Sequence, residues 1–134
     1  MTTYIQPASL SIVSLWTGRI ITGLVMIFLA FDGVTKIIQV APVVEASKKL
    51  GITSDSLLGI GIVLLTCTAI YAIPSTAILG AILLTGYLGG AAAIQVRAGS
   101  GAFPVAFSIV FGILVWVGPV LREPRLLWLI LQRQ

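Results

Sequence analysis

Two ionisable side chains lie within an otherwise apolar stretch in the first third of the chain. Asp32 and Lys36 are four positions apart, which places them on one face of an α-helix and lets them form an ion pair. Ionisable groups inside a membrane are costly and usually face the protein interior, so Asp32 is a candidate catalytic acid or base and Lys36 its electrostatic partner. A structural ion pair near the membrane surface is the alternative, and the sequence leaves both open.

A second polar group follows a later apolar run, at Gln95 and Arg97. If consecutive spans alternate in direction, this group lies on the same membrane face as the Asp32–Lys36 pair. A mouth lined by one carboxylate, one amide and two cations could bind the head of a quinone or of another small polar-headed lipid. Gln95 and Arg97 are therefore candidate cofactor-binding residues.

The stretch before Gln95 is rich in small residues. Gly86 and Gly90 form a G-x-x-x-G pattern, and Gly89 lies between them. Small residues let helices approach closely in lipid, so we interpret this helix as the packed centre of a bundle. The alternative is that the glycines line a void or a ligand slot, and Gly89 and Gly90 therefore join the candidate cofactor-binding residues.

The residue types that the chain lacks exclude several kinds of redox chemistry. It has no histidine, and its only cysteine is Cys67. A lone cysteine rules out an intramolecular disulfide or a C-x-x-C pair. With Met26 the only methionine besides Met1, the usual axial haem ligands are also missing. We expect no metal site and no intrinsic cofactor.

Membrane spans are the elements that must position these residues. The chain is 58% hydrophobic and 9% charged, whereas a soluble domain carries about 25% charged residues. Runs long and apolar enough to cross a bilayer as helices cover about residues 11–36, 56–72, 75–96 and 103–121. Pro74 separates the second run from the third, because proline interrupts a helix but suits the first turn of a new one.

Two shorter stretches combine apolar and polar residues. One covers residues 43–50 and ends at Gly51, and the other covers residues 123–134. Both are too short to span a bilayer and suit helices that lie on the membrane interface. The sequence therefore predicts an all-α fold, a four-transmembrane-helix antiparallel bundle with short interfacial helices after the first span and at the C-terminus. We expect a single integral membrane domain over residues 1–134.

The positive charges lie mostly beside the ends of the apolar runs. Snorkelling and lipid headgroups favour cations there, which is also the role we expect for Arg19. We therefore expect the lipid bilayer as a partner, together with other membrane subunits or self-association, and no nucleic acid. The eight Lys and Arg residues divide equally between the two faces, so the positive-inside rule decides little. We expect a multi-pass protein of a bacterial inner membrane. We place both termini on the cytoplasmic side of that membrane because Arg122, Arg125 and Arg133 are closely spaced.

Several motifs, taken in order, resemble the DoxX-like family. They are Trp16-Thr-Gly-Arg19, Phe31-Asp32-Gly33-Val-Thr-Lys36, the stretch from Pro74 to Ala91, Arg97 and Leu121-Arg-Glu-Pro-Arg125. The resemblance covers about residues 15–125. It implies a four-helix membrane protein with a link to thiosulfate:quinone oxidoreductase and to membrane redox complexes.

The resemblance also identifies recurrent positions. They are Asp32, Lys36, Gly89, Gly90 and Arg97. This chain departs from its relatives at residues 93–97, where they often carry a histidine and Gln95 stands here instead. Glutamine can form hydrogen bonds but cannot carry a proton near neutral pH, which argues against a proton-coupled quinone role.

Three functions follow from these observations. The preferred one is a subunit or accessory component of a membrane assembly, with a quinone as the candidate ligand. The second is a small membrane enzyme that acts on a hydrophobic substrate at a polar cluster around Asp32. The third is a lipid- or small-molecule-binding or transport module.

Overall fold

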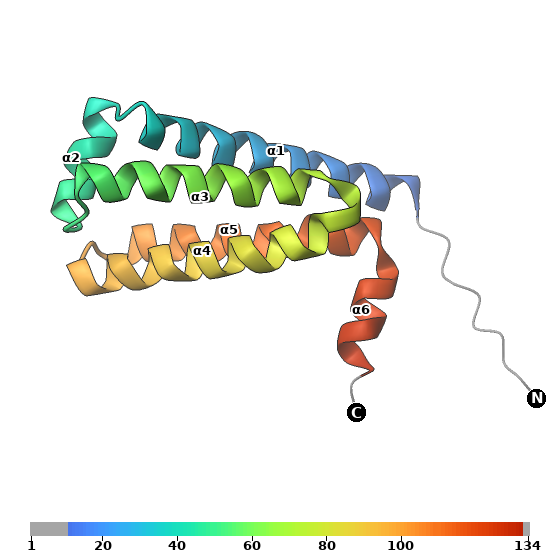
Figure 1. Cartoon of the computed structure of the whole chain (residues 1–134). Helices are drawn as coiled ribbons and strands as arrows, with labels where there is room; N and C mark the ends of the chain where they lie inside the picture. The colour runs from blue at the N-terminus through green and yellow to red at the C-terminus, as the bar shows by residue number, and fades with distance from the viewer. Residues whose placement is uncertain (1–10, 133–134) are drawn as a thin grey trace, which may run out of the picture.

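The structure is a computed structural model that describes residues 11–132. It consists of six α-helices and one short 3-10 turn (Figure 1). They are α1 (Ile12–Ile37), α2 (Ala41–Lys49), α3 (Ser54–Ala72), η1 (Pro74–Thr76), α4 (Ala77–Ala98), α5 (Ala102–Arg122) and α6 (Pro124–Leu131). The described part of the chain contains no strand, and the predicted all-α fold with four long helices is confirmed.

Local sequence signals explain where the long helices begin and end. The Ser11 hydroxyl accepts a hydrogen bond from the Ser14 backbone N–H at 3.1 Å and caps α1, and Thr53 caps α3 in the same way. A serine or threonine side chain satisfies a backbone donor that the first turn leaves free. The turn between α4 and α5 uses Gly99 and Gly101, whose φ angles of +64° and +93° favour glycine.

The two prolines of interest have different effects. At Pro74 the α-helix stops, and η1 turns the chain so that α3 and α4 form an antiparallel pair, as predicted. Pro119 lies inside α5, which continues through it to Arg122. A neighbouring helix packs against this turn, since Gly118 faces Thr22 of α1, and such packing helps a membrane helix to tolerate a proline.

The four long helices form a ring in which each contacts two antiparallel neighbours. Helix α1 packs against α3 and α5, and α4 packs against the same two helices. Close approaches lie at the end where η1 joins α3 and α4, and also between Gly33 of α1 and Gly61 of α3. A Cβ atom on Gly80 would overlap the backbone of Tyr71, and one on Gly18 would lie 2.9 Å from the Gly118 carbonyl oxygen. Glycine therefore lets the helices meet backbone to backbone at this end.

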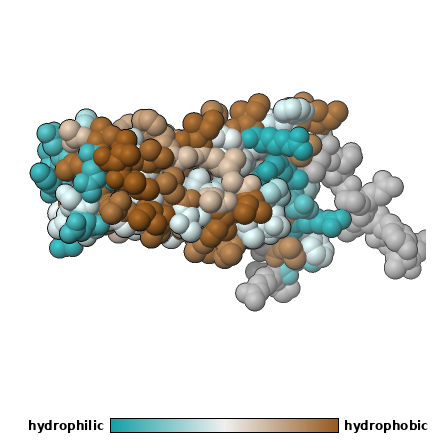
Figure 2. Space-filling view, turned by 45° about the horizontal axis from the view of Figure 1, so that its top comes forward, coloured by the Kyte–Doolittle hydropathy of each residue, from teal (hydrophilic) through white to brown (hydrophobic). Residues whose placement is uncertain are grey.

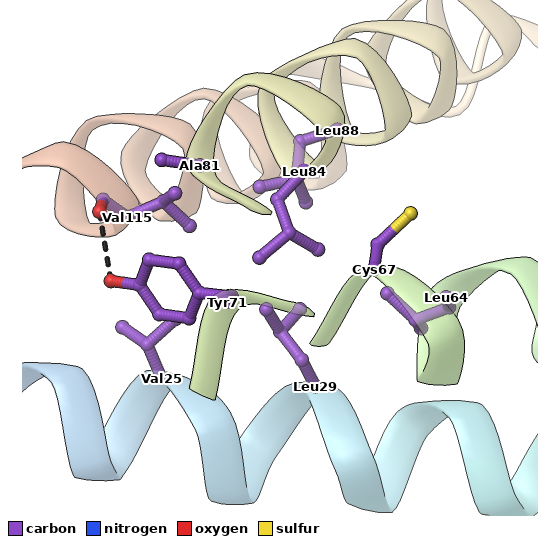
Figure 3. Close-up of a cluster of buried hydrophobic side chains, with 9 residues drawn as sticks. All are labelled: Val25, Leu29, Leu64, Cys67, Tyr71, Ala81, Leu84, Leu88 and Val115. Atoms are coloured by element: carbon purple, nitrogen blue, oxygen red, sulfur yellow. Dashed lines mark hydrogen bonds between the residues drawn. The ribbon is translucent and has the colours of Figure 1, made fainter. Parts of the chain in front are cut away.

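The buried core lies at the centre of this ring (Figure 3). Its side chains come from all four long helices. They are Val25, Leu29, Leu64, Cys67, Tyr71, Ala81, Leu84, Leu88 and Val115. The Tyr71 hydroxyl donates a hydrogen bond of 2.8 Å to the Val115 carbonyl oxygen. Cys67 is buried among these apolar side chains, and the hydroxyls of Thr66 and Thr68 bond to carbonyls of their own helix.

The outer surface identifies the chain as a multi-pass integral membrane protein. Four segments are each long and apolar enough to cross a bilayer. They are α1, α3, α5, and η1 together with α4. Hydrophobic side chains cover much of the central surface, whereas hydrophilic ones gather toward the two ends of the bundle (Figure 2). Large apolar residues such as Ile27 and Phe31 are about 70% exposed, which suits contact with lipid.

The two short helices form where the sequence predicts them. Helix α2 lies across the bundle at the end where α1 stops and α3 starts (Figure 1). Helix α6 turns away from the bundle at the opposite end, with Leu126 buried and Trp128 exposed. Arg133, which supported the expected orientation, lies outside the described residues.

Candidate functional site

A cavity opens between the helices at the α2 end of the bundle. Its volume is about 730 Å³, and residues of α1, α2, α3, α4 and α5 line it. Small-molecule sites in proteins typically occupy about 300–1,000 Å³ and are mostly apolar with a few polar groups. The volume and the lining both fall within this description.

The glycines of α4 explain why the cavity lies at this end. Gly80, near η1, is packed against Tyr71, so the interpretation of α4 as a packed centre holds there. Gly86 and Gly90 line the cavity, and a Cβ atom at either would meet nothing within 4 Å. The packing interpretation is therefore wrong for the G-x-x-x-G pattern itself, whose glycines leave open space.

The polar side of the cavity is built around the predicted ion pair. The Lys36 Nζ atom donates a hydrogen bond to the Asp32 Oδ2 atom within the last turns of α1. The Lys36 side chain is 16% exposed and the Asp32 side chain 32% exposed. Both side chains therefore lie largely inside the protein, and both line the cavity.

Four further polar side chains reach the cavity from other helices. Tyr87 and Gln95 come from α4. Ser47 of α2 and Ser108 of α5 are both buried. Amide and hydroxyl groups can both donate and accept hydrogen bonds. The cavity therefore offers an ion pair and several uncharged hydrogen-bonding groups to the polar part of a ligand.

Not every candidate residue belongs to this cavity. The structure brings Asp32, Lys36, Gln95 and Gly90 together. Arg97 is exposed and is not among the lining residues, and Gly89 faces a separate groove. The expected convergence of two cations at one mouth is therefore wrong, because α4 turns Arg97 away from the cavity.

An aromatic cluster forms the apolar side of the cavity and was missed by sequence reasoning. Phe28 of α1 lies with its ring centroid 4.5 Å from that of Phe111 and 5.5 Å from that of Phe107. Phe103 extends the row along α5, with its centroid 6.2 Å from that of Phe107. The signal was present, since phenylalanines at 103, 107 and 111 recur every fourth position and share one helix face.

The contribution of helix α2 to the cavity is the second feature that sequence reasoning missed, although the helix itself was predicted. Its apolar residues Val43, Ala46 and Leu50 line the cavity together with Ser47. An interfacial helix would turn such residues toward lipid, but here they face the space enclosed by the long helices. Helix α2 therefore covers the end of the site.

A shallower apolar groove runs between α4 and α5. Its volume is about 500 Å³, and its lining includes Gly89, Gly112 and Trp116. The Trp116 indole N–H donates a hydrogen bond of 2.7 Å to the Thr85 hydroxyl beside it. Nothing lies within 4 Å of a Cβ atom placed on Gly89 or Gly112, so the groove has room for an apolar chain or a neighbouring helix.

Two remaining findings concern metals and charge. Among residues 11–132, no three His, Cys, Asp or Glu side chains gather closely enough to hold a metal ion.

Arg19 is exposed toward the other end of α1, with its guanidinium carbon 5.8 Å from the centroid of the Trp16 ring. A cation above an aromatic face is stabilised there, apart from the cavity.

Comparison with known proteins gives one family match. A family model described as the DoxX-like family matches residues 20–118, which covers most of the chain and reaches from α1 into α5. No curated protein and no solved structure matches. The matched region contains Asp32, Lys36, Gln95 and the aromatic cluster that line the cavity.

Proposed function

This chain belongs to the DoxX-like family, and we propose that it binds an amphipathic small molecule within the membrane, in the cavity beneath α2. The observation that carries the proposal is the cavity itself. It combines an aromatic side formed by Phe28, Phe107 and Phe111 with a polar side formed by the Asp32–Lys36 pair and Gln95. Sites of this kind orient a ligand through a few polar groups and hold it through apolar burial.

A quinone is the first ligand to test. It carries carbonyl oxygens on a flat ring and an apolar tail, so the carbonyls could accept hydrogen bonds from Lys36 or from the Gln95 amide. The aromatic side chains favour a ring because offset and edge-to-face contacts add to the gain from burial. Because the Gln95 amide cannot carry a proton near neutral pH, we propose binding without proton transfer by this residue.

The test compares two neighbouring glycines of α4. Replacing Gly90 by Phe places a ring inside the cavity, whereas Gly89→Phe places the same ring in the outer groove. Decylubiquinone binding to the purified protein in nanodiscs should weaken about tenfold or more in Gly90→Phe, a loss of about 1.4 kcal/mol or more. It should be nearly unchanged in Gly89→Phe. If the two variants bind decylubiquinone equally well, or if the unmodified protein does not bind it, the proposal that the cavity is the binding site is wrong.

We further propose that the protein acts as a subunit or accessory component of a larger membrane assembly. The groove at Gly89 and Gly112 supports an assembly with other subunits. Small residues on a lipid-facing surface let a neighbouring helix approach closely. Purification in a gentle detergent followed by native mass spectrometry should give a mass above that of one chain. A strictly monomeric protein at all detergent concentrations would contradict the proposal.

A bacterial inner membrane with both termini on the cytoplasmic side completes the proposal. Arg122 and Arg125 support this orientation because they lie beside the end of α5. Positive charges near the ends of membrane spans favour the cytoplasmic side. Lys48 and Lys49 at the α2 end oppose it, and labelling from each side of the membrane decides between the two orientations.

A further inference from the structure

We propose that the cavity selects molecules with an uncharged polar head, and that this selectivity depends on the balance between the charges of Asp32 and Lys36. The inference rests on the proposed binding function and deepens it by naming the class of ligand. It separates uncharged heads, such as alcohols and carbonyl-bearing rings, from heads with a net negative or positive charge.

The charge balance of the cavity is the first observation behind this inference. Within the part of the chain that the structure describes, Asp32 and Lys36 are the only charged residues that line the cavity. They pair with each other, so their charges cancel at the site. Arg97 would have supplied an excess positive charge, but it is exposed elsewhere. The cavity therefore has no uncompensated charge to offer an ionic head.

The burial of the site makes this charge balance unfavourable for ionic head groups. The Lys36 side chain is only 16% exposed, and the surrounding walls are largely apolar. An ionic head that enters such a site loses its hydration and gains no counter-charge, which is strongly unfavourable. An uncharged head loses much less hydration free energy. It can also form hydrogen bonds with the Gln95 amide, with the Ser47 hydroxyl and with the Asp32 and Lys36 side chains.

The position of the pair in the fold supports a role in ligand choice. Asp32 and Lys36 lie on the same helix one turn apart, so α1 alone holds them together. Their neighbours across the cavity come from α2 and α4, which contribute Ser47 and Gln95. Replacing one member of the pair should leave the rest of the lining in place while giving the site a net charge.

The experiment uses three amphiphiles that differ in the head group alone. Hexadecanol is uncharged, palmitate is anionic and hexadecylamine is cationic, and all three have the same chain length. Their affinities for the full-length protein are measured by native mass spectrometry in nanodiscs of phosphatidylcholine. We expect the unmodified protein to bind hexadecanol about tenfold or more tightly than either charged amphiphile.

Single substitutions should then switch the preference in opposite directions. Asp32→Asn leaves Lys36 unpaired and should raise the affinity for palmitate about tenfold relative to hexadecanol. Lys36→Gln leaves Asp32 unpaired and should favour hexadecylamine in the same way. The double variant Asp32→Asn with Lys36→Gln carries no charge in the cavity, and it should restore the preference for hexadecanol. It is the matched control, because it carries both substitutions and no net charge in the cavity. Where an unpaired charge prevents a single variant from folding, the comparison of the three amphiphiles on the unmodified protein still tests the selectivity.

The outcomes separate the inference from the function on which it rests. Equal affinity for all three amphiphiles, or a preference of the unmodified protein for palmitate, would overturn the charge selectivity while leaving the binding function standing. Unchanged preferences in both Asp32→Asn and Lys36→Gln would also overturn the role of the pair. If neither these amphiphiles nor decylubiquinone bind at all, the proposed function fails first and the inference falls with it.

Discussion

Two glycines of α4 show how differently the same residue type is used in one helix. Gly80 lies against the backbone of Tyr71, with no room for a side chain. Gly89 lies at the outer groove, where a Cβ atom would meet nothing within 4 Å. The first glycine is required by helix packing, and the second leaves a surface open.

This difference predicts opposite effects of alanine on stability. Gly80→Ala should lower the free energy of unfolding by about 1–3 kcal/mol, because the backbone of Tyr71 cannot move away as the end of a flexible side chain would. Gly89→Ala, the matched control, should leave it unchanged or raise it by less than about 1 kcal/mol, since alanine is the better helix former. Thermal unfolding in detergent, followed by circular dichroism, measures both. An equal loss in the two variants would contradict the close contact at Gly80.

At the scale of elements, α2 is the helix whose role changes most when the structure is known. Its charged residues Glu45, Lys48 and Lys49 are exposed, whereas Val43, Ala46 and Leu50 line the cavity. Its amphipathic character therefore serves an internal surface as well as the outer one. The aromatic row of α5 follows the same principle, because Phe103, Phe107 and Phe111 present one face of their helix to the cavity.

Ligand protection tests the placement of α2. The lone native cysteine, Cys67, is buried, so a maleimide should report on an introduced cysteine. Labelling of Val43→Cys should slow about tenfold when decylubiquinone is present at about ten times its dissociation constant, because bound ligand covers this side of α2. Labelling of Glu45→Cys on the exposed side should not change. Slowing at both positions, or at neither, would show that α2 does not cover the site.

At the scale of the whole molecule, the helices pack closely near η1, whereas at the α2 end α1 and α3 pack closely at Gly33 and Gly61 but α4 leaves open space at Gly86 and Gly90. Backbone contacts at Gly18, Gly80 and Gly118 hold the helices together near η1. The opposite end leaves the cavity, which α2 covers. Because hydrophilic residues gather toward these two ends (Figure 2), the cavity lies closer to one face of the membrane than to the other.

Impermeant labelling tests both the span and the orientation. Lys49→Cys lies at the α2 end and Glu123→Cys between α5 and α6, and both positions are exposed. In right-side-out vesicles, an impermeant maleimide should label Lys49→Cys, and it should label Glu123→Cys only after the membrane is opened. The reverse pattern would invert the orientation. Labelling of both positions from one side would contradict four membrane spans.

The sequence by itself determined the features that depend on local interactions and on the solvent. Apolar runs long enough for a bilayer, with few charged residues, specify the four spans, and Pro74 specifies the break between α3 and α4. The ion pair between Asp32 and Lys36 was equally predictable, because helical geometry alone brings residues four apart together. These features need no knowledge of which helices are neighbours.

Only the tertiary structure decided which residues form the cavity. A G-x-x-x-G pattern is compatible with packing or with open space, and the direction in which α4 faces its neighbours settles the choice at Gly86 and Gly90. The same rotation directs Gln95 into the cavity and Arg97 away from it. Helix rotation in a bundle results from many side-chain contacts distant in sequence, and those contacts become defined when all the helices pack together.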